Sequence, residues 1–245
     1  MLKFTFQYSM AAILRCATAF LTLVLAGSAY ATTMEFASFH LLNANQSLSF
    51  TNNGGTSGTL QALSVPVIFN FTVQSGLPTG DHTASLTINP AGTAATTTPA
   101  TLAGSLLDQA INPLRFSIIE NGTGKNLLTM LSTTGDLVGL NGGVNASLSR
   151  ATTNVFSSDF ATFGSTFTES FNLGLATMSA PLAVGPGGFL NSFVSNVNGQ
   201  FSVDSAGFTP VPEPASAVLL GIGLLTIAAM ARRRPSRPGS ARDAS

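Results

Sequence analysis

The chain has 245 residues, of which only 8% are charged, and its 10 basic side chains balance its 10 acidic ones. The balance is uneven, because residues 32–210 contain three basic and eight acidic side chains, a net charge of −5, which excludes a basic nucleic-acid-binding surface. The only cysteine, Cys16, lies in the N-terminal apolar segment, so residues 32–210 offer no thiol for a disulfide, a metal or nucleophilic catalysis.

The first 31 residues have the pattern of a signal peptide. Lys3 and Arg15 precede an apolar run at 17–26, and Ala29 and Ala31 form the A-x-A pattern of a cleavage site. An apolar run of about ten residues is short against the roughly 20 that a membrane-spanning helix needs. We therefore expect cleavage after Ala31 and an exported protein, rather than an N-terminal membrane anchor.

Residues 32–210 have the pattern of an all-β domain. They are rich in Ser, Thr, Asn and Gly, and short alternating apolar and polar runs recur between turn signals such as Asn53-Gly54-Gly55. Strands of this length usually pack as two antiparallel sheets, so we expect an antiparallel β-sandwich. The predicted strands are 47–51, 59–65, 67–73, 83–88, 114–120, 127–131, 137–140, 144–150, 165–171, 173–177, 190–194 and 199–203.

Two segments within this domain also show helical spacing. Residues 101–110 are predicted as a short helix, because Leu102, Leu106 and Leu107 fall on one helical face. Five phenylalanines recur every three or four residues between 156 and 171, but Ser, Thr and Gly separate them and are poor helix formers. We assign residues from 165 onward to strand, leave a helix open for 154–163, and interpret the phenylalanines as core rather than as an aromatic binding platform. They are Phe156, Phe160, Phe163, Phe167 and Phe171.

Residues 32–210 contain no spacing typical of an active site or a metal site. His40 and His82 belong to no metal or nucleophile motif, and no G-x-S-x-G sequence is present. Adjacent strand residues face opposite sides, so Asp81 and His82 are predicted as a turn cap and an exposed side chain, not a dyad. The acidic residues are spaced singly and are interpreted as solvated carboxylates. We therefore expect no enzyme activity, no cofactor and no metal.

The C-terminal segment combines three features in a fixed order. The motif Val211, Pro212, Glu213, Pro214 is followed by an apolar stretch at 215–231 and then by Arg232, Arg233 and Arg234. The apolar stretch would form a helix of roughly 25 Å, at the short end of a membrane-spanning segment. Arginines directly after such a helix favour a cytoplasmic location for that end, which places residues 32–210 outside.

This order resembles the PEP-CTERM sorting tail, which is also described as the C-terminal domain of ice-binding-type proteins. The resemblance covers residues 211–234. It implies that an exosortase, a membrane cysteine protease-transpeptidase, cuts near the Pro-Glu-Pro motif, whose prolines hold an extended backbone. A permanent single-pass anchor is the alternative. The expected organisation is a signal peptide (1–31), a β-rich extracytoplasmic domain (32–210), the sorting tail (211–234) and a disordered cytoplasmic tail (235–245).

Three functions follow as hypotheses for the exported domain. The resemblance implies a non-enzymatic structural or adhesive role in the cell envelope or exopolysaccharide matrix, reached from an inner-membrane-anchored precursor. Polar β-faces rich in Thr and Asn suggest instead a carbohydrate- or ice-binding module, although the sequence has neither a tandem repeat nor a tryptophan for sugar stacking. A secreted hydrolase would need a catalytic cluster that only the fold could assemble. The expected partners are an exosortase, the membrane and an exopolysaccharide, and not nucleic acid.

Overall fold

The computed structural model describes residues 32–43, 45, 47–89, 96–150, 154–165 and 168–211. In these ranges the chain forms strands and three short 3-10 helices, and none of those helices has the length and apolar character needed to cross a membrane. The prediction of an all-β domain is confirmed. The elements are β1 (Thr33–Leu41), β2 (Leu48–Asn52), β3 (Gly58–Phe71), η1 (Val73–Ser75), β4 (His82–Ile88), β5 (Thr101–Ala103), β6 (Leu106–Ile111), β7 (Leu114–Glu120), β8 (Asn126–Ser132), β9 (Gly135–Leu140), β10 (Ala146–Arg150), β11 (Asn154–Ser157), β12 (Ala161–Phe163), β13 (Glu169–Ala176), η2 (Pro186–Gly188), β14 (Phe193–Asp204), η3 (Ser205–Gly207) and β15 (Phe208–Pro210).

Most of the strands belong to one continuous antiparallel sheet. Its order is β11-β8-β7-β4-β3-β1-β14-β13-β10-β9-β6-β5, and β2 pairs with β3 and β14 beyond the end of β1. The strands β1 and β2 therefore fill one position in the sheet, between β3 and β14, with residues 42–47 as the interruption. A separate pair, β12 and β15, forms a small two-stranded sheet.

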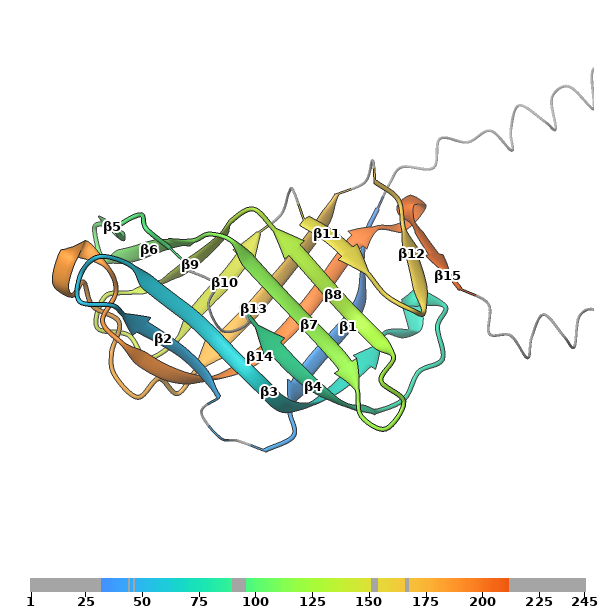
Figure 1. Ribbon diagram of the computed structural model, residues 1–245. Coiled ribbons are helices and arrows are strands. Elements are labelled where there is room, and N and C mark those ends of the chain that lie inside the picture. Colours follow the sequence, from blue (N-terminus) through green and yellow to red (C-terminus); the bar gives the residue numbers. More distant parts are fainter. Residues whose placement is uncertain are drawn as a thin grey trace, which may run out of the picture.

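The large sheet folds over on itself, so that strands from its two halves face each other across a core (Figure 1). The Phe116 ring on β7 lies 5.1 Å from that of Phe201 on β14 and 6.4 Å from that of Phe171 on β13. The sequence predicted two separate packed sheets. The structure instead has two layers that are joined through β3, β1 and β14.

Alternating side chains separate the core from the outer faces. Along β13 and β14 every second residue is buried, as expected for strands with one dry face. The core cluster is dominated by Phe, Leu, Ile and Val, and Phe36 packs against four other phenylalanine rings. Of the five phenylalanines with helical spacing, Phe156 and Phe171 are buried and Phe160 and Phe163 pack against the core, while Phe167 lies outside the described residues.

The predicted strands at 47–51, 83–88, 114–120, 127–131, 137–140 and 144–150 correspond to β2, β4, β7, β8, β9 and β10. Three pairs of predicted strands are single strands in the structure. The segments 59–65 and 67–73 merge in β3, 165–171 and 173–177 in β13, and 190–194 and 199–203 in β14.

β3 continues through Pro66 because the proline nitrogen, which lacks a hydrogen, faces a position where no ladder hydrogen bond is needed. The Leu42 N–H donates to the Pro66 carbonyl oxygen at 3.1 Å, so the Pro66 nitrogen also faces the gap between β1 and β2. No ladder hydrogen bond is lost there, which is the condition under which a sheet accepts proline.

The helix predicted for residues 101–110 is wrong. Residues Thr101–Ala103 and Leu106–Ile111 form the hairpin of β5 and β6, with Gly104 in the left-handed region at φ 63° in the turn. Leu107, Gln109 and Ile111 are buried and the residues between them face outward, a period of two that overrides the helical spacing of the leucines. The helix left open for 154–163 is also absent, because β11 and β12 lie there.

Candidate functional site

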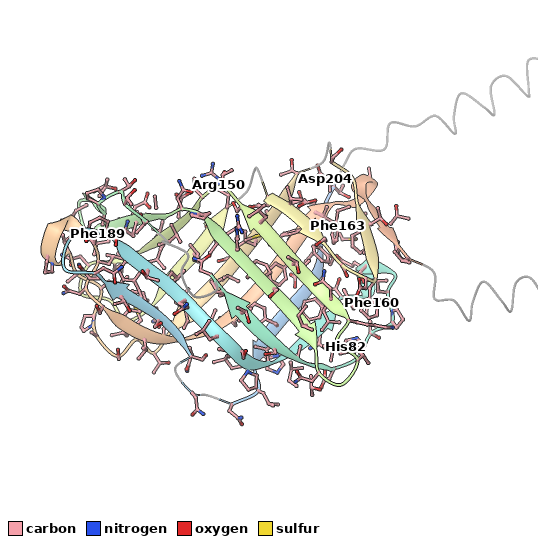
Figure 2. The ribbon with its side chains drawn as sticks, viewed as in Figure 1. His82, Arg150, Phe160, Phe163, Phe189 and Asp204 are labelled. Atoms are coloured by element: carbon pink, nitrogen blue, oxygen red, sulfur yellow. The ribbon has the colours of Figure 1, made fainter. Side chains whose placement is uncertain are left out.

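His82 forms an ion-pair contact that the sequence did not predict. Its Nδ1 lies 2.7 Å from Oε1 of Glu120 on β7, and the Thr123 hydroxyl donates to the other carboxylate oxygen. The hydrogen bonds from Thr123 and His82 lower the pKa of Glu120. The predicted exposed side chain is therefore half-buried, and Figure 2 shows it beside Phe160, whose ring centroid is 6.0 Å away. The contact links the beginning of β4 to the end of β7 at one end of the sheet.

Glu169 departs from the prediction that the acidic residues are solvated. Its side chain follows Phe171 and Leu173 onto the core side of β13, where it is 6% exposed. Its Oε2 accepts the Phe156 N–H at 2.6 Å, and the Asn154 amide donates to the Glu169 carbonyl oxygen at 2.6 Å. Burial raises the pKa of Glu169 to about 7. The residue thus ties β13 to β11, the edge strand of the opposite layer.

The remaining titratable groups are dispersed over the described residues. Asp108 and Asp136 lie on neighbouring strands, where burial and the charge of Asp136 raise the pKa of Asp108. Arg150 lies 3.5 Å from Asp136. Within the part of the chain that the structure describes, no group of three His, Cys, Asp or Glu side chains could hold a metal ion.

A broad outer face of the sheet carries short uncharged polar side chains in cross-strand register. One row passes through β3, β1, β14, β13, β10 and β9 before it reaches Ala110 on β6. At the usual strand separation it extends roughly 30 Å along the sheet. The row ends in a charged residue on β9, Asp136, which lies 3.5 Å from Arg150. Its uncharged members, which we refer to as the neutral row, are Asn70, Ser38, Gln200, Asn172 and Ser149.

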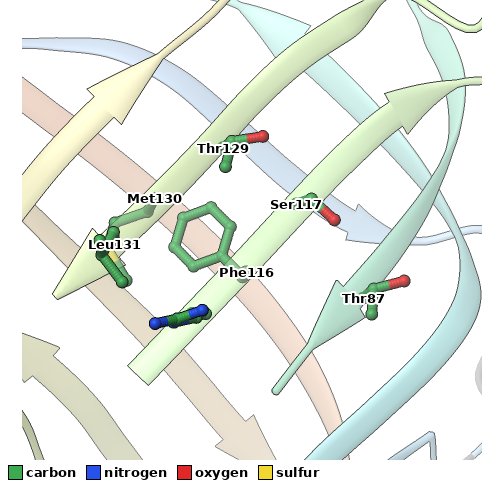
Figure 3. Close-up of a pocket in the computed structure, with 7 residues that line it drawn as sticks. Thr87, Phe116, Ser117, Thr129, Met130 and Leu131 are labelled. Carbon is green, nitrogen blue, oxygen red and sulfur yellow. The ribbon is translucent and has the colours of Figure 1, made fainter. Parts of the chain in front are cut away.

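A pocket lies on the other layer, where β4, β7 and β8 run side by side (Figure 3). Its volume is about 350 Å³. Thr87, Ser117 and Thr129 form one cross-strand row in it, and Arg115 and Leu131 form part of the next row. Phe116 and Met130, whose side chains are buried between the layers, complete the lining. We refer to this as the Arg115 pocket.

No residue of the Arg115 pocket was predicted from the sequence as part of a site. The alternation around Phe116 does indicate that Arg115 and Ser117 face outward. However, only the register of three strands shows that these residues meet Thr87 and Thr129.

The C-terminal end of the described chain is held firmly against the core. Phe208 on β15 packs with its ring centroid 5.3 Å from that of Phe36 and 5.5 Å from that of Phe163. The Val211 N–H donates to the Phe160 carbonyl oxygen at 2.8 Å. Thr32, the first described residue, accepts a hydrogen bond from the Ser205 N–H, so both ends of the described chain lie at one end of the molecule (Figure 1).

The comparison with protein families identifies the segment that follows. The family model described as the PEP-CTERM protein-sorting motif matches residues 210–234. The chain therefore carries a PEP-CTERM protein-sorting motif. No curated protein and no solved structure matches it.

The PEP-CTERM motif marks the chain as an exported protein whose precursor passes the membrane and is processed by an exosortase, a membrane enzyme. The matched segment begins at Pro210, the last residue of β15, and the structure describes Val211 after it. The other predicted sorting residues lie outside the described residues, as do the predicted signal cleavage site and the predicted membrane helix. They are Pro212, Glu213, Pro214, Arg232, Arg233, Arg234, Ala29 and Ala31.

Proposed function

We propose that the domain at residues 32–210 is a non-enzymatic structural or adhesive component of the cell envelope or exopolysaccharide matrix. Its adhesive surface is the outer face of β1, β14, β13, β10 and β9. The observation that carries this proposal is the row of short amide and hydroxyl side chains in register over that face.

The chemistry of the row suits a neutral polysaccharide. Side-chain amides and hydroxyls both donate and accept hydrogen bonds, as sugar hydroxyls do. Asn172 and Gln200 are exposed neighbours in the row, and the Ser147 hydroxyl from the adjacent row donates to Asn172 Oδ1 at 2.7 Å. Many weak contacts along one chain act together, so a broad face can retain a polymer without a deep site.

The placement of the titratable groups supports a non-enzymatic role. His82 and Glu120 are paired with each other at one end of the sheet, and Glu169 is buried between the layers. The residues that line the Arg115 pocket include neither an acidic side chain nor a histidine. A general acid or base within reach of a bound substrate is thus lacking in that pocket.

The proposal is tested by a charge change on the face. Asn172→Asp with Gln200→Glu keeps the size of both side chains but places two negative charges in the row, where desolvation against a neutral polymer is costly. We expect wild-type protein to fractionate with the extracellular matrix of the producing cells and the double variant to appear in the medium.

The matched control is Asn121→Asp with Asn141→Asp, which adds the same charge at two exposed turn residues away from the row. It should stay in the matrix, and circular dichroism should show the same fold for all three proteins. Equal retention of the two double variants, or absence of the wild-type protein from the matrix, would contradict the proposal.

A carbohydrate-binding module is the second candidate function, and the Arg115 pocket favours it over the ice-binding form of that hypothesis. A pocket with polar groups around a limited volume selects a small part of a ligand. Ice binding calls for a flat array of matched side chains, whereas the outer row mixes Ser, Asn and Gln of different lengths.

A further inference from the structure

We propose that the Arg115 pocket binds the carboxylate of an acidic sugar, such as a uronic acid unit of an extracellular polysaccharide. The inference rests on the proposed function, because the matrix is where the domain would meet such a polymer. The pocket lies on a different face of the molecule from the neutral row, and its charge, hydroxyls and shape suit such a ligand.

Arg115 differs from the other two cations of the domain because its guanidinium has no partner among the described residues. Arg150 lies beside Asp136, and the Lys125 Nζ lies 5.1 Å from the centre of the Phe160 ring. The Arg115 side chain is exposed and makes no hydrogen bond or ion pair with any other described residue. Its backbone, by contrast, is fixed by two hydrogen bonds with Asn89, both 2.8 Å long. A rigid strand therefore presents a free guanidinium to the pocket.

Hydroxyl groups lie next to this guanidinium. The hydroxyls of Thr87 and Ser117 have no hydrogen-bond partner among the described residues, and each can donate and accept. The Thr129 hydroxyl donates to Asn126 Oδ1 at 2.9 Å, which leaves its lone pairs to accept from a ligand. Successive strands place these three groups roughly 4.8 Å apart. The row continues to the exposed Ser157 on β11, which gives a polymer a path out of the pocket.

The shape and apolar lining suit a sugar ring. The volume of about 350 Å³ is at the lower end of the range for small-molecule sites, which fits a small part of a polymer. Leu131 is 45% exposed beside Arg115 and offers an apolar surface to the C–H groups of a ring. Val155, which pairs with Leu131, is 62% exposed and extends this surface onto the edge strand β11.

The charge of the pocket suits one carboxylate at a time. A guanidinium matches a planar carboxylate with two parallel hydrogen bonds, and such charge-assisted pairs are strong. Arg115 is the one cation among the residues that line the pocket, and hydroxyl groups lie beside it. A uronic acid unit, with one carboxylate and several hydroxyls on its ring, fits this arrangement.

The test uses the full-length chain purified in detergent, with trigalacturonate as the acidic probe and galactotriose as the neutral one. Calorimetric titration should detect binding of trigalacturonate only. Arg115→Ala should weaken that binding by about tenfold or more, as expected for the loss of a charge-assisted pair. Arg115→Lys keeps the charge without the planar fork and should restore only part of the affinity.

Lys125→Ala is the matched control, because it removes one exposed cation at the opposite end of β7 from Arg115. It should bind trigalacturonate as the wild type does, and thermal unfolding should show that every variant is folded. Unchanged binding in Arg115→Ala, equal binding of galactotriose, or inorganic sulfate binding as tightly as trigalacturonate would each overturn the proposal.

The two proposals fail separately. A protein that is retained in the matrix but does not bind trigalacturonate contradicts the pocket alone. A protein that binds trigalacturonate through Arg115 but is absent from the matrix supports the pocket and contradicts the proposed function.

Discussion

Glu169 is a carboxyl group that the fold keeps away from water. It is 6% exposed, and its Oε2 accepts a single backbone hydrogen bond, from Phe156. One such bond offsets only part of the cost of burying a charge, so burial dominates and raises the pKa from 4.5 to about 7. Its protonation therefore affects the stability of the fold near neutral pH.

The sign of this effect follows from the two protonation states. Between pH 4.5 and about 7 the folded protein keeps the proton that the unfolded chain has lost, so stability falls as the pH rises and levels off above about 7. The shift corresponds to about 3 kcal/mol. We predict that Glu169→Gln, which is neutral and still accepts from Phe156, removes this part of the pH dependence in urea unfolding between pH 5 and 8.

Glu35→Gln provides the comparison for that experiment, since it makes the same chemical change at a residue on β1 that is less buried. The slope of stability against pH should be preserved in this variant. A Glu169→Gln protein that loses stability with pH as steeply as wild type would show that Glu169 does not carry the effect.

One pattern in the sequence indicates the buried location of Glu169, and it involves only neighbouring residues of the same strand. The residue has the same parity as Phe171, Leu173 and Leu175, which places it on the core side of any strand through them. The contact with β11 could not be predicted, because it joins the layers across the fold. The pairing of His82 with Glu120, which are 38 residues apart, could not be predicted either, because it depends on the register of β4 against β7.

Gly199 shows how one small residue lets β14 pass through the middle of the sheet. It pairs with Phe39 on β1 and Leu173 on β13, on the core side. A Cβ at this position would lie 2.2 Å from Cε1 of Phe39 and 2.8 Å from Cδ2 of Leu173. Because Gly199 has no side chain, Phe39 and Leu173 can pack into the space that a Cβ would occupy.

We predict that Gly199→Ala destabilises the protein by about 1 to 3 kcal/mol, because the added methyl group overpacks the core. Chemical denaturation measures the change. Gly174→Ala on β13 is the control, since its Cβ would meet the end of the exposed Asn198 side chain, which can rotate away. That variant should stay within about 0.5 kcal/mol of wild type. Equal stability of the two variants would show that the core at Gly199 accommodates a methyl group.

The alternation of buried residues and the turn-forming residues explain which strands could be predicted. β4 and β7 alternate cleanly, and the sequence located them closely. β14 was divided at residues 195–198, where Ser195, Asn196 and Asn198 are typical of a turn, and β3 was divided at Pro66, although both strands are continuous in the sheet. β1 was missed, because a bulge between Glu35 and Ala37 leaves Phe36 and Ala37 both buried and disturbs the alternation. The Arg115 pocket depends on register between strands, which alternation within one strand does not specify.

At the scale of the whole molecule, the sorting motif begins directly after the packed end of the domain. The β12 and β15 pair packs Phe163 and Phe208 against Phe36 at the end where the described chain both begins and stops. The PEP-CTERM match starts at the last residue of β15. An exosortase would therefore meet its motif directly beyond a firmly held residue, Val211.

This arrangement leads to a prediction about the mature product. We predict that the signal peptide is removed after Ala31 and that the tail is cut near Pro212 to Pro214, so that the intact mass is well below the 25.1 kDa of the full chain. Pro212→Ala with Pro214→Ala should leave the tail in place, since the extended backbone that the prolines impose is lost. Pro235→Ala, beyond the arginines, should be processed as wild type. A wild-type protein that keeps residues 215–234 in the mature form would instead identify the tail as a permanent anchor.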